Sequence, residues 1–211
     1  MPAVTKTPDE RRRNEKARTA ILRAAGELLD RRGFRRLTIE GIAARAGVGK
    51  TTIYRWWPSK AAVVMDAVLE AASPRIPFPD TGSAREDLRS QIASVIELYT
   101  NTKTGRGIRA LIAESQHDPS LAESLRDRFI ASRRAEAATV FERGIERGEL
   151  RPDLDVDVAI DALYGAVYYR LLVSHAPLDA AYADTLIDQL FPAIESSAGQ
   201  STAVASSRTR S

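Results

Sequence analysis

The segment from Gly47 to Thr52 carries the residue types that hold phosphate in nucleotide-binding loops. A loop of that kind needs a second glycine five residues before Gly49, where this chain has Ala44, and it follows a buried strand. Residues 40–46 have instead the pattern of a short helix. A P-loop-like nucleotide-binding protein therefore stays only as an alternative. The same segment suits a second chemistry, which is contact with the phosphates and base edges of DNA.

A row of polar side chains follows Gly49 on what the periodicity predicts to be a short helix. On a helical wheel Ile53 and Trp57 face inward, while four neighbouring side chains project outward near the start of the helix, where a recognition helix touches bases. These outward residues are Lys50, Thr51, Tyr54 and Arg55. No acidic residue occurs from Gly41 to Met65, so phosphates would meet no repulsion there. We predict that this helix reads DNA.

The residues that flank this helix on either side are predicted to hold the DNA backbone. Thr38 and Ser59 are predicted N-cap residues, so each marks the start of a helix, where free backbone N–H groups can bind a phosphate. Lys60 adds a positive charge at the helix start that follows Ser59. Trp56 carries an indole N–H that reaches either a phosphate or only the end of the helix. Phosphate contacts of this kind position a protein on DNA without reading its sequence.

Helices must position these side chains. Ile21, Ala24, Ala25, Leu28 and Leu29 predict a helix from about Glu15 to Gly33. Gly47 separates a helix over 38–47 from a third one that carries Ile53 and Trp57 and ends at Pro58, and a fourth runs over 59–73. Ala43, Gly47 and Ile53 have the spacing of a helix-turn-helix. Three prolines and a glycine then predict a break over 74–85.

The rest of the chain keeps a helical period without any alternating strand pattern. Predicted helices cover 86–103, 106–116, 120–148, 156–174 and 180–194. The helix over 156–174 is apolar on more than one side, so it and its neighbour need a partner surface. We expect a homodimer through 156–194, with Leu171 and Leu190 in the interface. The fold class is all-α, with an N-terminal three-helix DNA-binding domain and a larger helical domain for ligand binding and dimerisation.

The charge distribution indicates that the basic N-terminal part and the acidic remainder of the chain bind different partners. Residues 1–60 hold 15 basic and 6 acidic residues, a net charge of +9, whereas residues 61–211 carry a net charge of −6. The chain has no cysteine and only two histidines, His117 and His175, neither of them in a ligand cluster. We therefore expect no catalytic site, metal or cofactor. No signal peptide or membrane-spanning stretch is seen, which favours a cytoplasmic protein.

The segment Ile42-Ala43 through Gly47-Val48-Gly49-Lys50-Thr51-Thr52-Ile53-Tyr54-Arg55-Trp56-Trp57-Pro58-Ser59-Lys60 resembles the DNA-binding motif of TetR-family transcriptional regulators. Residues from Asp118-Pro119 through Gly148–Asp153 to Tyr168-Tyr169-Arg170 also resemble ligand-binding domains of that family. The resemblance implies a homodimer that binds palindromic double-stranded operator DNA and, as a repressor, is released by a small-molecule effector. Gly49 and Trp56 depart from it, since many members have a serine and a histidine there.

The predicted DNA contacts are Thr38, Lys50, Thr51, Thr52, Tyr54, Arg55, Trp56 and Lys60. The predicted domains are a flexible basic arm over 1–14, a DNA-binding domain over 15–73, a linker over 74–85, an effector-binding and dimerisation domain over 86–195, and a disordered tail over 196–211. Effector contacts cannot be assigned, although Tyr99, Phe129, Phe141, Tyr164 and Tyr168 are candidate lining or plain core. The main alternative is an architectural DNA-binding protein without an effector.

Overall fold

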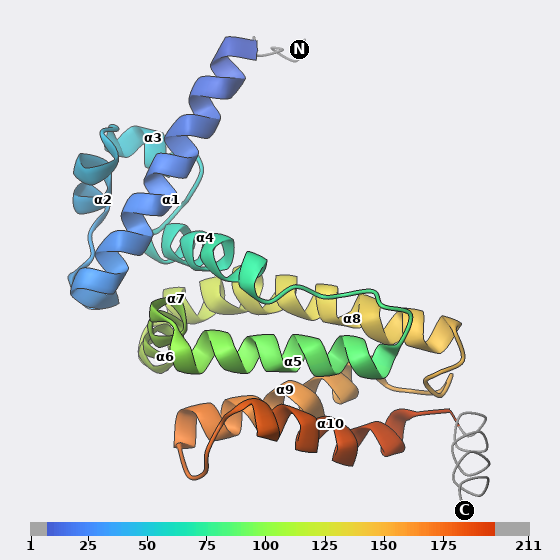
Figure 1. The fold of residues 1–211 in the computed structure, drawn as a ribbon. Helices are drawn as coiled ribbons and strands as arrows, with labels where there is room; N and C mark the ends of the chain where they lie inside the picture. Colours follow the sequence, from blue (N-terminus) through green and yellow to red (C-terminus); the bar gives the residue numbers. More distant parts are fainter. Residues whose placement is uncertain (1–7, 197–211) are drawn as a thin grey trace, which may run out of the picture. The chain divides into compact units, whose positions relative to one another are not determined.

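The computed structural model describes residues 8–196, which divide into two compact units (Figure 1). The all-α prediction is confirmed, because every named element within these residues is a helix and the one β-bridge joins Leu150 to Glu195. Residues 1–7 of the predicted arm and 197–211 of the predicted tail lie outside the described residues. The domain boundaries drawn from the sequence remain predictions.

The first unit combines the N-terminal helices with Ala110–Phe129. Four helices come from the N-terminal part: α1 (Pro8–Arg36), α2 (Ile39–Ala46), α3 (Lys50–Tyr54) and α4 (Lys60–Ala72), whose last residue belongs to the second unit. The later segment adds the end of α6 (Lys103–Ser115), α7 (Pro119–Ser124) and most of the π-helix η2 (Leu125–Ile130). Ile21, Ile42 and Ile53 are completely buried in it. The apolar periodicities of α1, α2 and α3 therefore converge on one core.

The second unit is built around α5 (Ala84–Asn101), which packs against three other helices. These are α8 (Ala131–Glu146), α9 (Val156–Val173) and α10 (Ala180–Ile194). The apolar stripe of α5 faces this core, since all of its members are buried: Leu88, Ile92, Val95, Ile96 and Tyr99. The backbone N–H of Arg151 donates to the carbonyl of Ile194 (3.0 Å), which ties the chain after α8 to the end of α10.

Helix α1 begins earlier than the sequence pattern predicts. We expected a start near Glu15, but α1 starts at Pro8, so residues 8–14 of the predicted arm are helical. Proline is compatible with the first turn of a helix, where its missing N–H group costs no hydrogen bond. At the predicted end, Gly33 has φ 71° and interrupts the helical geometry, but α1 resumes beyond it and ends at Arg36.

The helix predicted over 120–148 consists of three segments. Asp118 caps α7 by accepting a hydrogen bond from the N–H of Leu121 (3.0 Å), α8 ends at Glu146, and η2 joins the two. The π-helix escaped prediction because no glycine or proline marks it. Segments of this kind are rare and often occur at functional positions.

The chain between α4 and α5 is anchored rather than free. A short 3₁₀ helix, η1 (Ser73–Arg75), precedes Ile76, whose side chain is buried. On α8, Arg133 donates to the carbonyl of Ile76 (2.5 Å) and Arg143 donates to that of Pro79 (2.8 Å). The prolines thus break the helix as predicted, while two arginines hold the segment on the second unit.

Candidate DNA interface

The connection between α2 and α3 is a tight turn at Gly47. Its φ of 68° lies in the left-handed region that favours glycine, and its N–H caps the end of α2 on the carbonyls of Ala43 and Ala44. At the other end of α2 the hydroxyl of Thr38 accepts a hydrogen bond from the N–H of Gly41 (3.0 Å). Thr38 thus has the predicted capping role, and its contact with DNA stays a prediction.

Helix α3 presents one buried and one exposed side. Ile53 is completely buried, whereas Lys50, Thr51, Tyr54 and Arg55 are exposed and Thr52 is half-buried. Tyr54 has 53% of its surface exposed, although a large aromatic side chain of this kind usually gains by burial. The four side chains predicted to project outward from this helix are therefore exposed in the structure.

Two of these exposed cations have partners on neighbouring helices. The Nζ of Lys50 pairs with a carboxylate oxygen of Glu40 (3.0 Å), and this pair is exposed on both sides. The guanidinium of Arg55 donates to Oδ1 of Asn14 on α1 (3.0 Å) and lies 4.8 Å from the ring centroid of Trp56. Exposed pairs are worth little in water, so both cations can exchange their partners for phosphates or bases.

The two tryptophans after α3 have different surroundings. Trp57 is 2% exposed, and its Nε1 donates to Oδ2 of Asp66 on α4 (2.7 Å). Arg128 in η2 donates to both oxygens of Asp66 (3.0 and 3.1 Å), which completes a chain of three partners. Trp56 is half-buried and meets Trp57 edge to face, with ring centroids 5.6 Å apart. Sequence reasoning identified Trp57 as core but missed Asp66 and Arg128, which no local motif marks.

Lys60 at the start of α4 is already engaged within the protein. Its Nζ donates to the carbonyl of Phe34 (3.0 Å) and lies 4.1 Å from the ring centroid of the same residue. The neighbouring Ser59 accepts a hydrogen bond from the N–H of Ala62 (3.1 Å), as a cap does. A phosphate contact by Lys60 therefore requires its ammonium group to exchange a carbonyl partner for an anion.

Replacing Lys60 with alanine is expected to weaken binding to all DNA sequences alike. If Lys60 neutralises one phosphate, the slope of log affinity against log salt becomes shallower by about one. Titrations of a specific and a random duplex at several salt concentrations measure both quantities. A loss confined to the specific duplex would contradict the phosphate role, and an unchanged slope would leave Lys60 with the Phe34 contact alone.

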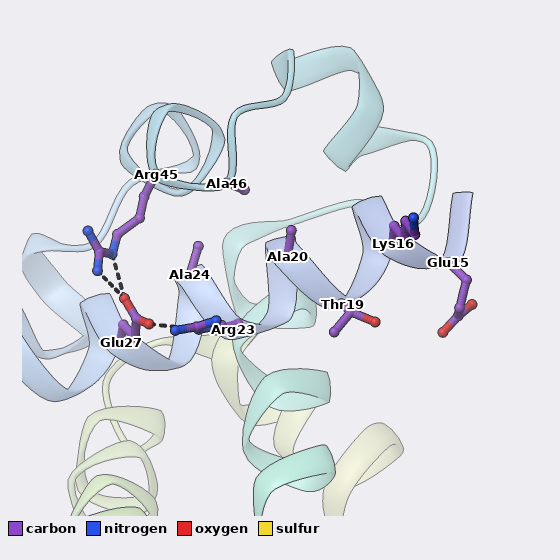
Figure 2. Close-up of a pocket in the computed structure, with 9 residues that line it drawn as sticks. All are labelled: Glu15, Lys16, Thr19, Ala20, Arg23, Ala24, Glu27, Arg45 and Ala46. Atoms are coloured by element: carbon purple, nitrogen blue, oxygen red, sulfur yellow. Dashed lines mark hydrogen bonds and ion pairs between the residues drawn. The ribbon is translucent and has the colours of Figure 1, made fainter. Parts of the chain in front are cut away.

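A groove of about 1030 Å³ runs between α1 and α2 in the first unit (Figure 2). Alanines line part of it, and charged side chains surround them: Glu15, Lys16, Arg23, Glu27 and Arg45. Glu27 accepts hydrogen bonds from Arg45 and from Arg23 (3.0 Å), and these bonds lower the pKa of its carboxyl group. This carboxylate holds α2 against α1 and neutralises part of the local positive charge.

The aromatic residues suggested for an effector site do not gather around one cavity. Tyr164 and Tyr168 line one groove between α8 and α9, Phe141 lines a separate apolar cleft, and Tyr99 and Phe129 are buried. Among residues 8–196, no three His, Asp or Glu side chains are placed to hold a metal ion. None of the helices in the same residues combines the length and apolar character needed to cross a membrane.

Comparison with known proteins agrees with this architecture. Residues 21–67 match the sequence profile described as bacterial regulatory proteins, tetR family, and residues 78–190 match that described as tetracyclin repressor-like, C-terminal domain. The chain is 41% identical over 185 residues to the uncharacterized HTH-type transcriptional regulator YdeS of Bacillus subtilis (strain 168), covering 88% of this chain and 93% of that one. The crystal structure of the TetR family transcription regulator SCO0332 superposes with a TM-score of 0.75 and 42% identity, covering 84% and 97% of the two chains.

Proposed function

Because this chain belongs to the TetR family of helix-turn-helix transcriptional regulators, we propose that its α3 reads operator DNA through Tyr54 and Arg55. The observation that carries this proposal is the set of exposed side chains that follows the turn at Gly47, on the side of α3 opposite the buried Ile53. The arginine fork suits bidentate contact with guanine, and the tyrosine ring and hydroxyl suit a thymine methyl or a base edge.

The other predicted contacts have supporting roles in this proposal. Lys50 and Thr51 start the same helix, beside the bases that Tyr54 and Arg55 reach. Thr52 and Trp56 are half-buried at the edge of the exposed row and, with Thr38 and Lys60, are assigned to the DNA backbone. Contacts of that kind set the register of the protein on DNA, while the base contacts give specificity.

The proposed dimer surface is the exposed face of α9. Five large apolar side chains are exposed among the described residues, and four of them lie on α9: Val158, Tyr169, Leu172 and Val173. An apolar cleft of about 200 Å³ between α9 and α10 adjoins Val158 and is lined by Leu190. Apolar area of this extent on a folded surface supports self-association. Leu171 was misassigned to this interface, because it is buried within the protomer.

As a member of this family the protein is a regulator that leaves its operator when an effector binds. In a dimer the two α3 helices enter major grooves one helical turn or a multiple apart, so a change in their spacing releases DNA. The effector must favour the released state by several kcal/mol to shift occupancy strongly. We propose that the helical part beyond residue 73 holds the effector and transmits this preference.

Replacing Tyr54 or Arg55 with alanine is expected to weaken specific operator binding by about 10- to 100-fold each, since one good base contact is worth about 1–3 kcal/mol. Fluorescence anisotropy with an operator duplex and a random duplex at fixed salt measures the effect. Binding to the random duplex should change little, and the fold should be retained because both side chains are exposed.

Two control variants separate base reading from a general charge effect and from a structural role of Arg55. Arg106→Ala removes one positive charge from an exposed position on α6 and should leave operator affinity unchanged. Asn14→Ala removes the protein partner of Arg55. If Asn14→Ala reproduced the whole effect of Arg55→Ala, the role of Arg55 would be to hold its segment against α1 and not to contact bases. Weak binding of the wild type to every duplex would favour the architectural alternative.

A further inference from the structure

A groove of about 350 Å³ lies between α8 and α9 in the second unit. Its volume is within the range of small-molecule sites. Arg133, Arg134 and Ala137 line it from α8, Ile160, Asp161, Tyr164, Gly165 and Tyr168 line it from α9, and the charged groups are paired at its edge. Its surface is thus mostly apolar and aromatic, whereas the larger groove between α1 and α2 has charged and alanine lining without an aromatic ring.

The tyrosine hydroxyl groups are already occupied. The hydroxyl of Tyr164 donates to Oε1 of the buried Gln91 (2.6 Å), and those of Tyr168 and Tyr99 share a hydrogen bond (2.7 Å). Both partners lie on α5, so α5 holds the hydroxyl ends of these two groove-lining residues. The hydroxyl groups are uncharged at neutral pH, and burial raises the pKa of all three tyrosines further above their ordinary value. A ligand would therefore meet the rings rather than free hydroxyl groups.

The charged groups around the groove also have partners. Arg134 pairs with Asp157 (2.9 Å) and with Asp161. Arg133 donates to Glu136 (3.1 Å) and to the carbonyl of Ile76, and its guanidinium lies over the ring of Phe78. A charged ligand would have to displace one of these pairs or lose its own hydration without compensation.

We propose that this groove is the effector site and that it takes an uncharged, flat aromatic molecule that packs on the rings of Tyr164 and Tyr168. This inference rests on the proposed function as an effector-released regulator. Offset stacking and edge contacts with tyrosine rings favour aromatic ligands over aliphatic ones of equal area.

The position of the groove along the chain suits regulation. Ile130 lines the groove and is the last residue of the π-helix η2. Two residues earlier in the same π-helix, Arg128 holds Asp66, which in turn holds the indole N–H of Trp57 behind α3. A ligand that contacts Ile130 therefore touches the same π-helix that carries Arg128, the residue that holds Asp66 beside Trp57.

The test uses a matched pair of probes with the same ring system, uncharged 2-naphthol and anionic 2-naphthoate, at pH 7. Calorimetric titration of the full-length wild type should detect 2-naphthol and find 2-naphthoate at least tenfold weaker. Gly165→Leu extends a side chain from a helical position whose Cβ would meet open space, and should abolish naphthol binding. Ala93→Leu, in a different groove lined by α5 and α10, should bind as the wild type does.

A second pair of variants separates ring from hydroxyl. Tyr168→Phe keeps the ring and should retain naphthol binding, whereas Tyr168→Leu should lose it. Absence of naphthol binding to the wild type, equal binding of the anion, or unchanged binding by both Gly165→Leu and Tyr168→Leu would overturn the proposal. Operator titration without any probe is independent: if it failed while naphthol bound as predicted, the assignment as an operator-binding regulator would fall and the aromatic site would stand.

Discussion

Replacing Val158 and Leu172 together with aspartate is expected to give folded monomers that bind the operator about 10²- to 10⁴-fold more weakly than the wild type. Both side chains are about half exposed or more in the protomer, at 61% and 49%, so charging them does not disturb its core. Two carboxylates on the α9 face would instead lose their hydration when two copies associate. A monomer holds one half-site only and loses the effective concentration that links the two contacts.

Sedimentation measures the dimer, circular dichroism the fold, and anisotropy the operator affinity of this double variant. The matched control is Ser90→Asp with Ala131→Asp, which adds the same charge at exposed positions on α5 and α8. This control should stay dimeric. A dimer of normal stability from the α9 variant would place the interface elsewhere, and would leave the four exposed apolar residues of α9 facing solvent.

Replacing Trp57 with alanine is expected to destabilise the first unit by about 3–5 kcal/mol, which is the usual cost of removing a large buried aromatic side chain. The indole is 2% exposed, and its loss also removes one of the donors that Asp66 accepts from. Since the whole stability of a domain is typically about 5–15 kcal/mol, this variant should lose much of its folded population, and its specific DNA binding with it. Urea unfolding followed by circular dichroism measures the change.

Trp57→Phe separates the ring from its hydrogen bond. It keeps a smaller aromatic ring in the core and removes the N–H donor to Asp66 together with part of the buried indole, so we expect a loss of about 1–3 kcal/mol. Arg128 still satisfies both oxygens of Asp66 in this variant, which favours the lower end of that range. Equal losses from phenylalanine and alanine would mean that the hydrogen bond, and not the packing of the ring, stabilises this region.

The helix-turn-helix could be predicted from the sequence because its signals are local. Thr38, Gly47 and Pro58 act on the backbone within one turn of their own positions, and Ile53 and Trp57 are separated by one helical turn. The outward positions of Lys50, Thr51, Tyr54 and Arg55 follow from the same geometry. What these four side chains contact across the chain, such as Asn14 and Glu40, does not follow from it.

Two features could not be predicted from the sequence: the groove between α8 and α9, and the hydrogen bonds that link Trp57 to Arg128 through Asp66. Asp66 and Arg128 are 62 positions apart, and each is an ordinary charged residue in its own helix until packing brings the two together. Leu171 and Leu172 show the same limit, because adjacent positions on an amphipathic helix differ by about 100° and only the packed neighbours decide which of them is covered.

The sequence by itself determined that the chain is helical, that a glycine turn joins two short helices near its basic end, and that one late helix is apolar on more than one side. These properties depend on backbone preferences and on periodicity, which act over a few residues. Only the tertiary structure decided which apolar face stays uncovered, which tyrosine rings line a groove, and which ion pairs close around it. Those outcomes depend on contacts between residues far apart in the chain, and the energy of such contacts exists only once the helices have packed.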